Sequence, residues 1–168
     1  MTKCPDHLCF LREINNIFPD AHIIWTHRDP VKVIASYSSL TSLFRRTMYG
    51  QVHTEGIGPY ISRRFLASVN RAMEYRALSG RIVHDLDFSE FVQSQVRTIQ
   101  DLLPKLNLEQ NIETFYLLCE EHSRMRRKRS DARGSHRYSL ETFGVNPQET
   151  VLRFGHYMDT YQVERELH

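Results

Sequence analysis

The sequence has few cysteines, and their spacing is not that of a structural site. Cys4, Cys9 and Cys119 are odd in number and irregularly placed, so they form neither a disulfide framework nor a zinc knuckle. A reducing compartment is the expected setting, and we predict a cytoplasmic location. A leader or membrane anchor lost from the N-terminus stays open as an alternative.

Long apolar runs and a strong charge are also absent. No stretch approaches the roughly 20 apolar residues of a transmembrane segment, and the N-terminus has no apolar core of the secretory type. The 22 lysines and arginines nearly balance the 20 acidic residues, for a formal net charge of +2. That charge is too small to indicate a polyanionic partner by itself.

Two motifs of phosphoryl-transfer enzymes are missing, and no metal site is indicated. No Walker-type glycine-lysine loop occurs. His27-Arg28-Asp29 resembles a kinase catalytic loop, but proline follows and no asparagine stands at the required offset. Asp85 and Asp87 would share one face of a strand, yet no histidine or third carboxylate is spaced to join them. We therefore predict no metal.

The most informative stretch is residues 22–40. A short apolar run, Ile23 to Trp25, ends at a polar tip, and Pro30 then opens a helical pattern of apolar residues. This pattern predicts a strand over residues 22–27 that enters a helix through a tight turn. Asp29 is the expected cap of that helix, with proline at its first position.

An anion site is expected where this strand meets this helix. Ligands of open α/β sheets bind beyond the carboxyl ends of strands, near helix N-termini. Arg28 provides a forked cationic donor for phosphate or sulfate, and Ser36 follows in the second helical turn with a hydroxyl. The alternative is an ordinary arginine ion pair beside a solvent-facing serine.

The rest of the chain reads as mostly helical. Helices are predicted over 5–18, 60–79, 91–106 and 109–125, a second strand over 81–88, a loop over 50–59 and a basic, turn-rich segment over 126–136. Asn146-Pro147-Gln148-Glu149 predicts the start of the last helix. We interpret residues 1–168 as a single helix-rich α/β domain with a small, mostly parallel sheet. Two strands are too few for a doubly wound sheet, so part of it is missing or the core is unusually helical.

Several motifs together resemble one enzyme family. They are Lys3-Cys4-Pro5-Asp6-His7-Leu8, Phe18-Pro19-Asp20-Ala21, His27-Arg28-Asp29-Pro30 with Ser36 and Ser39-Leu40, His136-Arg137-Tyr138-Ser139-Leu140, and Phe143-Gly144-Val145. The chain is similar to the bacterial-type sulfotransferases that use 3′-phosphoadenosine 5′-phosphosulfate (PAPS). The resemblance implies a partial P-loop-NTPase-like domain, its carboxyl-terminal portion only.

The resemblance also implies site residues. Arg28 and Ser36 match the residues that hold the 3′-phosphate of PAPS, and Lys3 matches the lysine that contacts the sulfuryl group. His7 is the candidate general base, although its spacing from Lys3 differs from that of the cytosolic branch and other branches use a glutamate. A helix-cap role is its alternative. Arg133 and Gly134 resemble a basic loop that closes over the nucleotide phosphate, within a segment that otherwise reads as a solvated charge run.

The implied function is transfer of a sulfuryl group from PAPS to a hydroxyl or amine of a small-molecule or glycan acceptor. In the family, the loop that holds the 5′-phosphosulfate would precede Lys3, so the chain is expected to need a missing N-terminal half or to be inactive alone. A second interpretation is a non-catalytic remnant that binds a nucleotide or a protein, or forms a homodimer. A third is nucleic-acid binding through residues 124–133, which predicts steeply salt-dependent affinity and which we do not favour.

Overall fold

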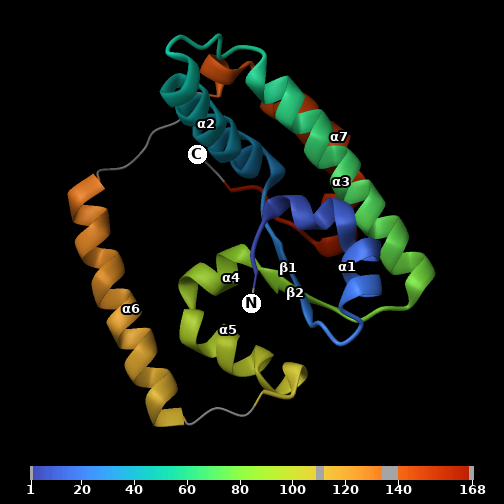
Figure 1. The fold of residues 1–168 in the computed structure, drawn as a ribbon, viewed down its shortest axis with the longest axis vertical. Helices are drawn as coiled ribbons and strands as arrows, with labels where there is room; N and C mark the ends of the chain where they lie inside the picture. The colour runs from blue at the N-terminus through green and yellow to red at the C-terminus, as the bar shows by residue number, and fades with distance from the viewer. Residues whose placement is uncertain (1, 109–111, 134–139, 167–168) are drawn as a thin grey trace. The chain divides into compact units, whose positions relative to one another are not determined.

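The computed structural model describes residues 2–108, 112–133 and 140–166, with the backbone alone at 112, 113, 123 and 126–133. The chain divides into two compact units. The first combines the residues up to Asp85 with those from Tyr138 onward, and the second is Leu86–Arg137 (Figure 1). We describe each unit by itself, and the interpretation of the chain as a single domain stays a prediction.

The first unit contains β1, most of β2, and α3, the longest helix of the described residues. Two strands, β1 and β2, form a small parallel sheet, which confirms the predicted helix-rich α/β class. The described part of the second unit is mostly helical. In chain order the elements are η1 (Pro5–Phe10), α1 (Leu11–Ile17), β1 (Ile23–His27), α2 (Pro30–Tyr49), α3 (Ile57–Ser79), β2 (Val83–Asp87, whose last two residues belong to the second unit), α4 (Phe88–Gln93), α5 (Gln95–Leu102), η2 (Pro104–Leu106), α6 (Ile112–Arg133), η3 (Glu141–Phe143) and α7 (Pro147–Tyr161).

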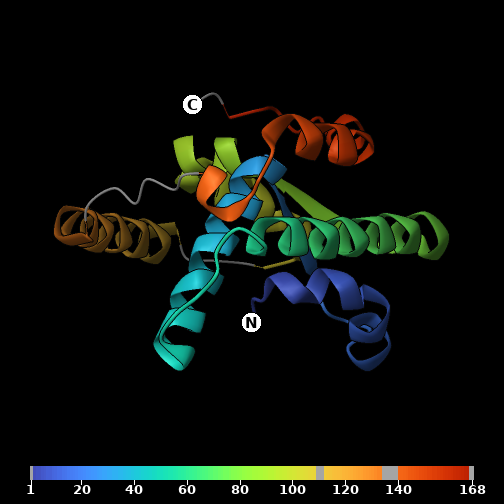
Figure 2. The same ribbon diagram turned by 90° about the horizontal axis from the view of Figure 1, so that it is seen from above.

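Helix α3 is the central element of the first unit. It packs against α2, and it lies between η1 and α1 on one side and α7 on the other (Figure 2). Its buried face carries several small residues, among them Gly58, Ser62 and Ala72, which let neighbouring segments approach closely. Gly80 ends the helix with a left-handed backbone at φ 61°, the conformation that glycine adopts without steric cost.

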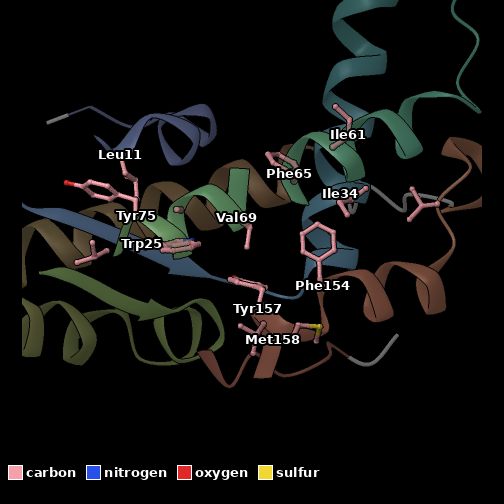
Figure 3. Close-up of a cluster of buried hydrophobic side chains, with 14 of the residues drawn as sticks. Leu11, Trp25, Ile34, Ile61, Phe65, Val69, Tyr75, Phe154, Tyr157 and Met158 are labelled. Carbon is pink, nitrogen blue, oxygen red and sulfur yellow. The ribbon is translucent and has the colours of Figure 1, made fainter. Parts of the chain in front are cut away.

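One hydrophobic core holds these helices against β1 (Figure 3). Trp25 comes from the strand, Ile34 from α2, Ile61 and Phe65 from α3, and Phe154 from α7, and all five are buried. Along α3 the buried apolar residues of this cluster recur every three or four positions, as the 3.6-residue periodicity predicts. This core fixes the position of β1, where the candidate site begins.

The helix boundaries agree with the sequence at some ends and differ at others. Helix α3 begins at Ile57, inside the loop expected over 50–59, and the helix expected over 91–106 is broken at Ser94 into α4 and α5. The turn-rich interpretation of residues 126–136 is wrong up to Arg133, because α6 continues to that residue. Arginine and lysine favour helices, and neither glycine nor proline interrupts 112–133. Residues 134–136 lie outside the described residues.

The structure also bears on the absence of apolar runs. None of the described helices is long and apolar enough to cross a bilayer.

Gly58 should tolerate substitution poorly. A Cβ at this position would overlap the carbonyl oxygen of Phe143 and Cγ2 of Val145, and η3 would have to move to relieve the contact. We expect Gly58→Ala to lower the free energy of unfolding by about 1–3 kcal/mol, the usual cost of overpacking. Urea denaturation of both proteins would measure it.

Gly155 provides the matched control in α7. A Cβ there would meet nothing within 4 Å, so Gly155→Ala should raise stability by about 0.5–1 kcal/mol through helix propensity alone. Equal effects of the two substitutions would contradict the close packing of α3 on η3.

Candidate functional site at the carboxyl end of β1

The candidate site is the short connection between β1 and α2. The strand ends at His27 and the helix begins at Pro30, so Arg28 and Asp29 form the whole turn. Asp29 is only 3% exposed. Its Oδ1 accepts a hydrogen bond of 2.8 Å from the backbone N–H of Val31, which confirms it as the cap of α2. Sequence analysis therefore located the strand, the turn and the helix start correctly.

Arg28 is engaged with an acidic group from the far end of the chain. Its Nε and Nη2 donate to the two carboxylate oxygens of Glu166, at 2.6 and 2.9 Å. The two side chains are 31% and 32% exposed, so the pair is half-buried. A planar fork that binds two oxygens of one acid is the geometry by which arginine recognises carboxylate or phosphate. The structure thus shows Arg28 in an ion pair with the protein's own glutamate, the contact that sequence analysis gave as the alternative to an anion site.

Ser36 lies in the second turn of α2, two turns from the strand end, and its side chain is half-buried. The residues beside it in the helix, Ile34 and Ala35, face the core. Neither this position nor the contact of Arg28 tests whether the two residues share a ligand. Their joint grip on one phosphate stays a prediction.

His27, the last residue of β1, has partners different from those of Arg28. The ring is 3% exposed. Its Nε2 lies 2.8 Å from Oδ1 of Asp85, and its Nδ1 lies 3.2 Å from the hydroxyl of Tyr157. Tyr161 stacks on the ring with a centroid separation of 4.3 Å. Since both nitrogens have partners and the ring is buried, His27 is suited to positioning the strand end and not to reacting with an external substrate.

Arg76 completes this network on the far side of Asp85. Its Nη1 and Nη2 donate to the two oxygens of Asp85 at 2.6 and 2.9 Å. The guanidinium also lies over the rings of Trp25 and Tyr161, 5.7 and 5.2 Å from their centroids, where cation–π attraction adds to the ion pair. The network therefore links β1, the end of α3, β2 and α7.

The charges of this network shift the pKa values of its members. Burial by itself would raise the pKa of Asp85, but the hydrogen bonds from Arg76 and His27 outweigh it and lower the pKa below its usual range. The hydrogen bond to Asp85 in turn raises the pKa of Arg76. Burial raises the pKa of Tyr161. Asp85 is therefore ionised at neutral pH and accepts from both donors.

Lys3 and His7 lie in a different part of the first unit. Lys3 is exposed in the segment before η1, and His7 is half-buried within η1, where its backbone N–H bonds the carbonyl of Cys4 at 3.1 Å. Asp6 between them pairs with Arg64 of α3 at 2.7 Å, which fastens η1 to that helix. The structure gives both side chains a place but tests neither chemical role, so these roles stay predictions.

A small cavity lies beside this segment. It has a volume of about 190 Å³ and is lined by residues of η1, α1 and α3: Leu8, Leu11, Arg12, Arg71, Glu74 and Tyr75. The cavity shares η1 with His7 but includes neither Arg28 nor Ser36.

The remaining predicted site residues fall at the edge of the description. Arg133 is the last residue of α6, but its side chain and the whole of Gly134 lie outside the described residues. Asp85 and Asp87 have different roles. Asp85 pairs with His27 and Arg76, whereas Oδ1 of Asp87 caps α4 by accepting a hydrogen bond of 2.9 Å from the backbone N–H of Glu90. No group of three potential metal ligands occurs in the part of the chain that the structure describes.

Sequence reasoning missed four members of the site. Arg76, Tyr157 and Tyr161 read as ordinary residues of amphipathic helices, and Glu166 follows the last predicted helix without any motif. A single acidic residue gives no sign of which arginine it will meet. The one usable signal was the buried strand end itself, because a histidine there needs polar partners from neighbouring elements.

Comparison with known proteins gives two matches. A family model described as "Sulfotransferase family" matches residues 1–112. The crystal structure of sulfotransferase STF9 from Mycobacterium avium superposes with a TM-score of 0.74 at 22% sequence identity. The match covers 99% of this chain and 42% of that chain, so this chain spans less than half the length of that protein. No curated protein matches.

Asp85 should contribute to stability in a pH-dependent way. Because its pKa is lower in the folded protein, its contribution is present above the unfolded value, about 4, and is lost as the pH falls through the folded value. We expect Asp85→Asn to lower the free energy of unfolding by about 1–2 kcal/mol at pH 7, since it leaves His27 and Arg76 poorly paired. The difference from the natural protein should shrink below about pH 4.

Urea denaturation across pH 3–8 would measure this difference. Asp159→Asn, at an exposed position of α7, is the matched control and should change stability by less than about 0.5 kcal/mol at any pH. A pH-independent effect of Asp85→Asn would show that the carboxylate acts through shape and not through charge.

Proposed function

Because this chain belongs to the sulfotransferase family, we propose that it binds the nucleotide PAPS and takes part in transferring its sulfuryl group to a hydroxyl or amine of a small-molecule or glycan acceptor. The observation that carries the proposal is the arginine fork of Arg28 at the carboxyl end of β1, which holds both oxygens of an acid. That fork occupies the place where open α/β folds bind anionic ligands.

Arg28 and Ser36 are proposed to hold the 3′-phosphate. The guanidinium would replace its carboxylate partner with two phosphate oxygens, and the serine hydroxyl would donate to a third. The N-terminus of α2 begins two residues after Arg28, so its partial positive charge would favour the same anion. Asp29, buried and already bonded to the helix, would keep the turn rigid while the ligand is exchanged.

Lys3 and His7 are proposed to act at the reacting end. The acceptor oxygen or nitrogen attacks sulfur, the bond from sulfur to the 5′-phosphate oxygen breaks, and 3′,5′-ADP leaves. His7 would take the acceptor's proton, and Lys3 would stabilise the charge that develops on the sulfuryl and bridging oxygens. Arg133 and Gly134 are proposed to cover the nucleotide phosphate.

The complete reaction is a proposal for the whole protein, because the chain spans only 42% of the sulfotransferase that it resembles in fold. Binding of the 3′-phosphate, in contrast, would rest mainly on Arg28 and Ser36, which both belong to the first unit. It is therefore the part of the function that this chain can be tested for directly.

Binding of 3′,5′-ADP is the direct test. We expect calorimetry to detect binding to the natural chain, and we expect Arg28→Ala to weaken it by about 10- to 100-fold, the effect of losing a charge-assisted pair of hydrogen bonds. Ser36→Ala should weaken it by about two- to tenfold, since a single hydroxyl contact is lost. Far-ultraviolet circular dichroism would confirm that each variant is folded.

Arg45→Ala controls for the loss of a positive charge on the same helix, because Arg45 is exposed near the other end of α2. It should leave the affinity unchanged. If the folded chain shows no binding of 3′,5′-ADP, or if Arg45→Ala weakens binding as much as Arg28→Ala does, the proposed phosphate site is wrong and a non-catalytic role becomes the better interpretation.

A further inference from the structure

The segment after α7 brings a carboxylate to the proposed phosphate site. Glu166 places both of its oxygens on Nε and Nη2 of Arg28, although the two residues are 138 positions apart in the sequence. These are two of the donors that would bind a phosphate group. A carboxylate and a phosphate cannot use the same two N–H groups of one arginine simultaneously.

The position of Glu166 does not depend on its side chain. Helix α7 ends with Gln162 in a left-handed conformation, and the N–H of Val163 bonds the carbonyl of Met158 at 2.9 Å. Val163 is buried in the core of the first unit. The backbone N–H of Glu166 then donates to Oδ2 of Asp29 at 2.9 Å. Three backbone and apolar contacts therefore hold the segment across the β1–α2 turn.

Asp29 makes this arrangement specific to the site. One of its oxygens caps α2 through Val31, and the other accepts from Glu166. Asp29 therefore both caps α2 and holds the segment after α7 at the proposed phosphate site. The Glu166 side chain leads directly from this anchored backbone to Arg28.

From this geometry we propose that Glu166 is a built-in competitor of the nucleotide phosphate. In the closed state, which is the paired state seen in the structure, the carboxylate of Glu166 neutralises Arg28. PAPS or 3′,5′-ADP binds only after that carboxylate moves away. The inference rests on the proposed function, because it assigns Arg28 to the phosphate. It adds a regulatory contact: the apparent affinity is the intrinsic affinity reduced by the fraction of molecules in which Arg28 is released.

The size of the effect follows from the exposure of the pair. Both side chains of the ion pair are about one-third exposed. Such a pair contributes only modestly to the stability of the closed state, because water competes for both groups. The need to break this pair should therefore lower the affinity for the nucleotide by a small factor and not abolish binding. We expect about a two- to fivefold gain in affinity when the competitor is removed.

The experiment compares 3′,5′-ADP binding by calorimetry in the natural chain, Glu166→Gln and Glu166→Ala. Glutamine keeps the shape of the side chain but loses its charge, and alanine removes the side chain. Both should bind about two- to fivefold more tightly than the natural chain. Glu164→Gln is the matched control, because it removes the same charge from an exposed position two residues earlier, and it should not change the affinity.

Each result decides a different claim. Equal affinity in the natural chain and both Glu166 variants overturns the competitor, while the proposed phosphate site survives. Weaker binding in both variants also overturns it, because Glu166 would then orient Arg28 for the ligand. A gain of the same size in Glu164→Gln reduces the effect to general electrostatics. Absence of binding in every folded variant removes the proposed function and this inference together.

Discussion

Three consecutive residues at the end of β1 determine how the first unit is assembled. His27 reaches β2 and α7 through Asp85 and Tyr157, Arg28 reaches Glu166 beyond α7, and Asp29 caps α2 and accepts from the Glu166 backbone. His27 ends the strand, and Arg28 and Asp29 form the turn that follows, so one tripeptide can contact several neighbouring elements. The geometry of the candidate site therefore depends on the same bonds that join the beginning of the unit to its end.

Core packing and this polar network make different contributions. The apolar cluster around Trp25, Ile34 and Phe154 supplies most of the free energy of folding, because apolar burial is the dominant favourable term. Arg76, Asp85 and His27 add less net stability, since Asp85 is 41% exposed at its side chain and such pairs are screened by water. Their directional bonds instead fix where β1 stops. A site that must hold a phosphate needs this positional precision more than it needs extra stability.

Local signals in the sequence predicted much of this fold, but contacts between residues that are distant in the sequence could not be predicted from it. Asp29-Pro30 and Asn146-Pro147 mark helix starts because the cap and the proline act within one turn, and the structure has both helices at these residues. The charged run before Arg133 suggested a turn, whereas its residues are good helix formers and α6 continues through them. The partners of Arg28 and His27 could not be read from the sequence, since pairing across 138 and 130 positions depends on the path of the whole chain.

The contact between Arg28 and Glu166 joins these two levels of description. From the sequence, Arg28 is expected either to bind an anionic ligand or to form an ordinary ion pair, and in the structure it forms an ion pair with Glu166 at the predicted turn. The fork geometry of arginine suits carboxylate and phosphate alike, so an arginine that is proposed to hold a phosphate can equally hold a glutamate. Because the backbone of Glu166 is anchored by Asp29 and the preceding Val163 is buried, its side chain can leave the arginine without unseating the segment. If Glu166 competes with the nucleotide as proposed, binding requires the loss of a partly exposed ion pair, a contact that water already weakens.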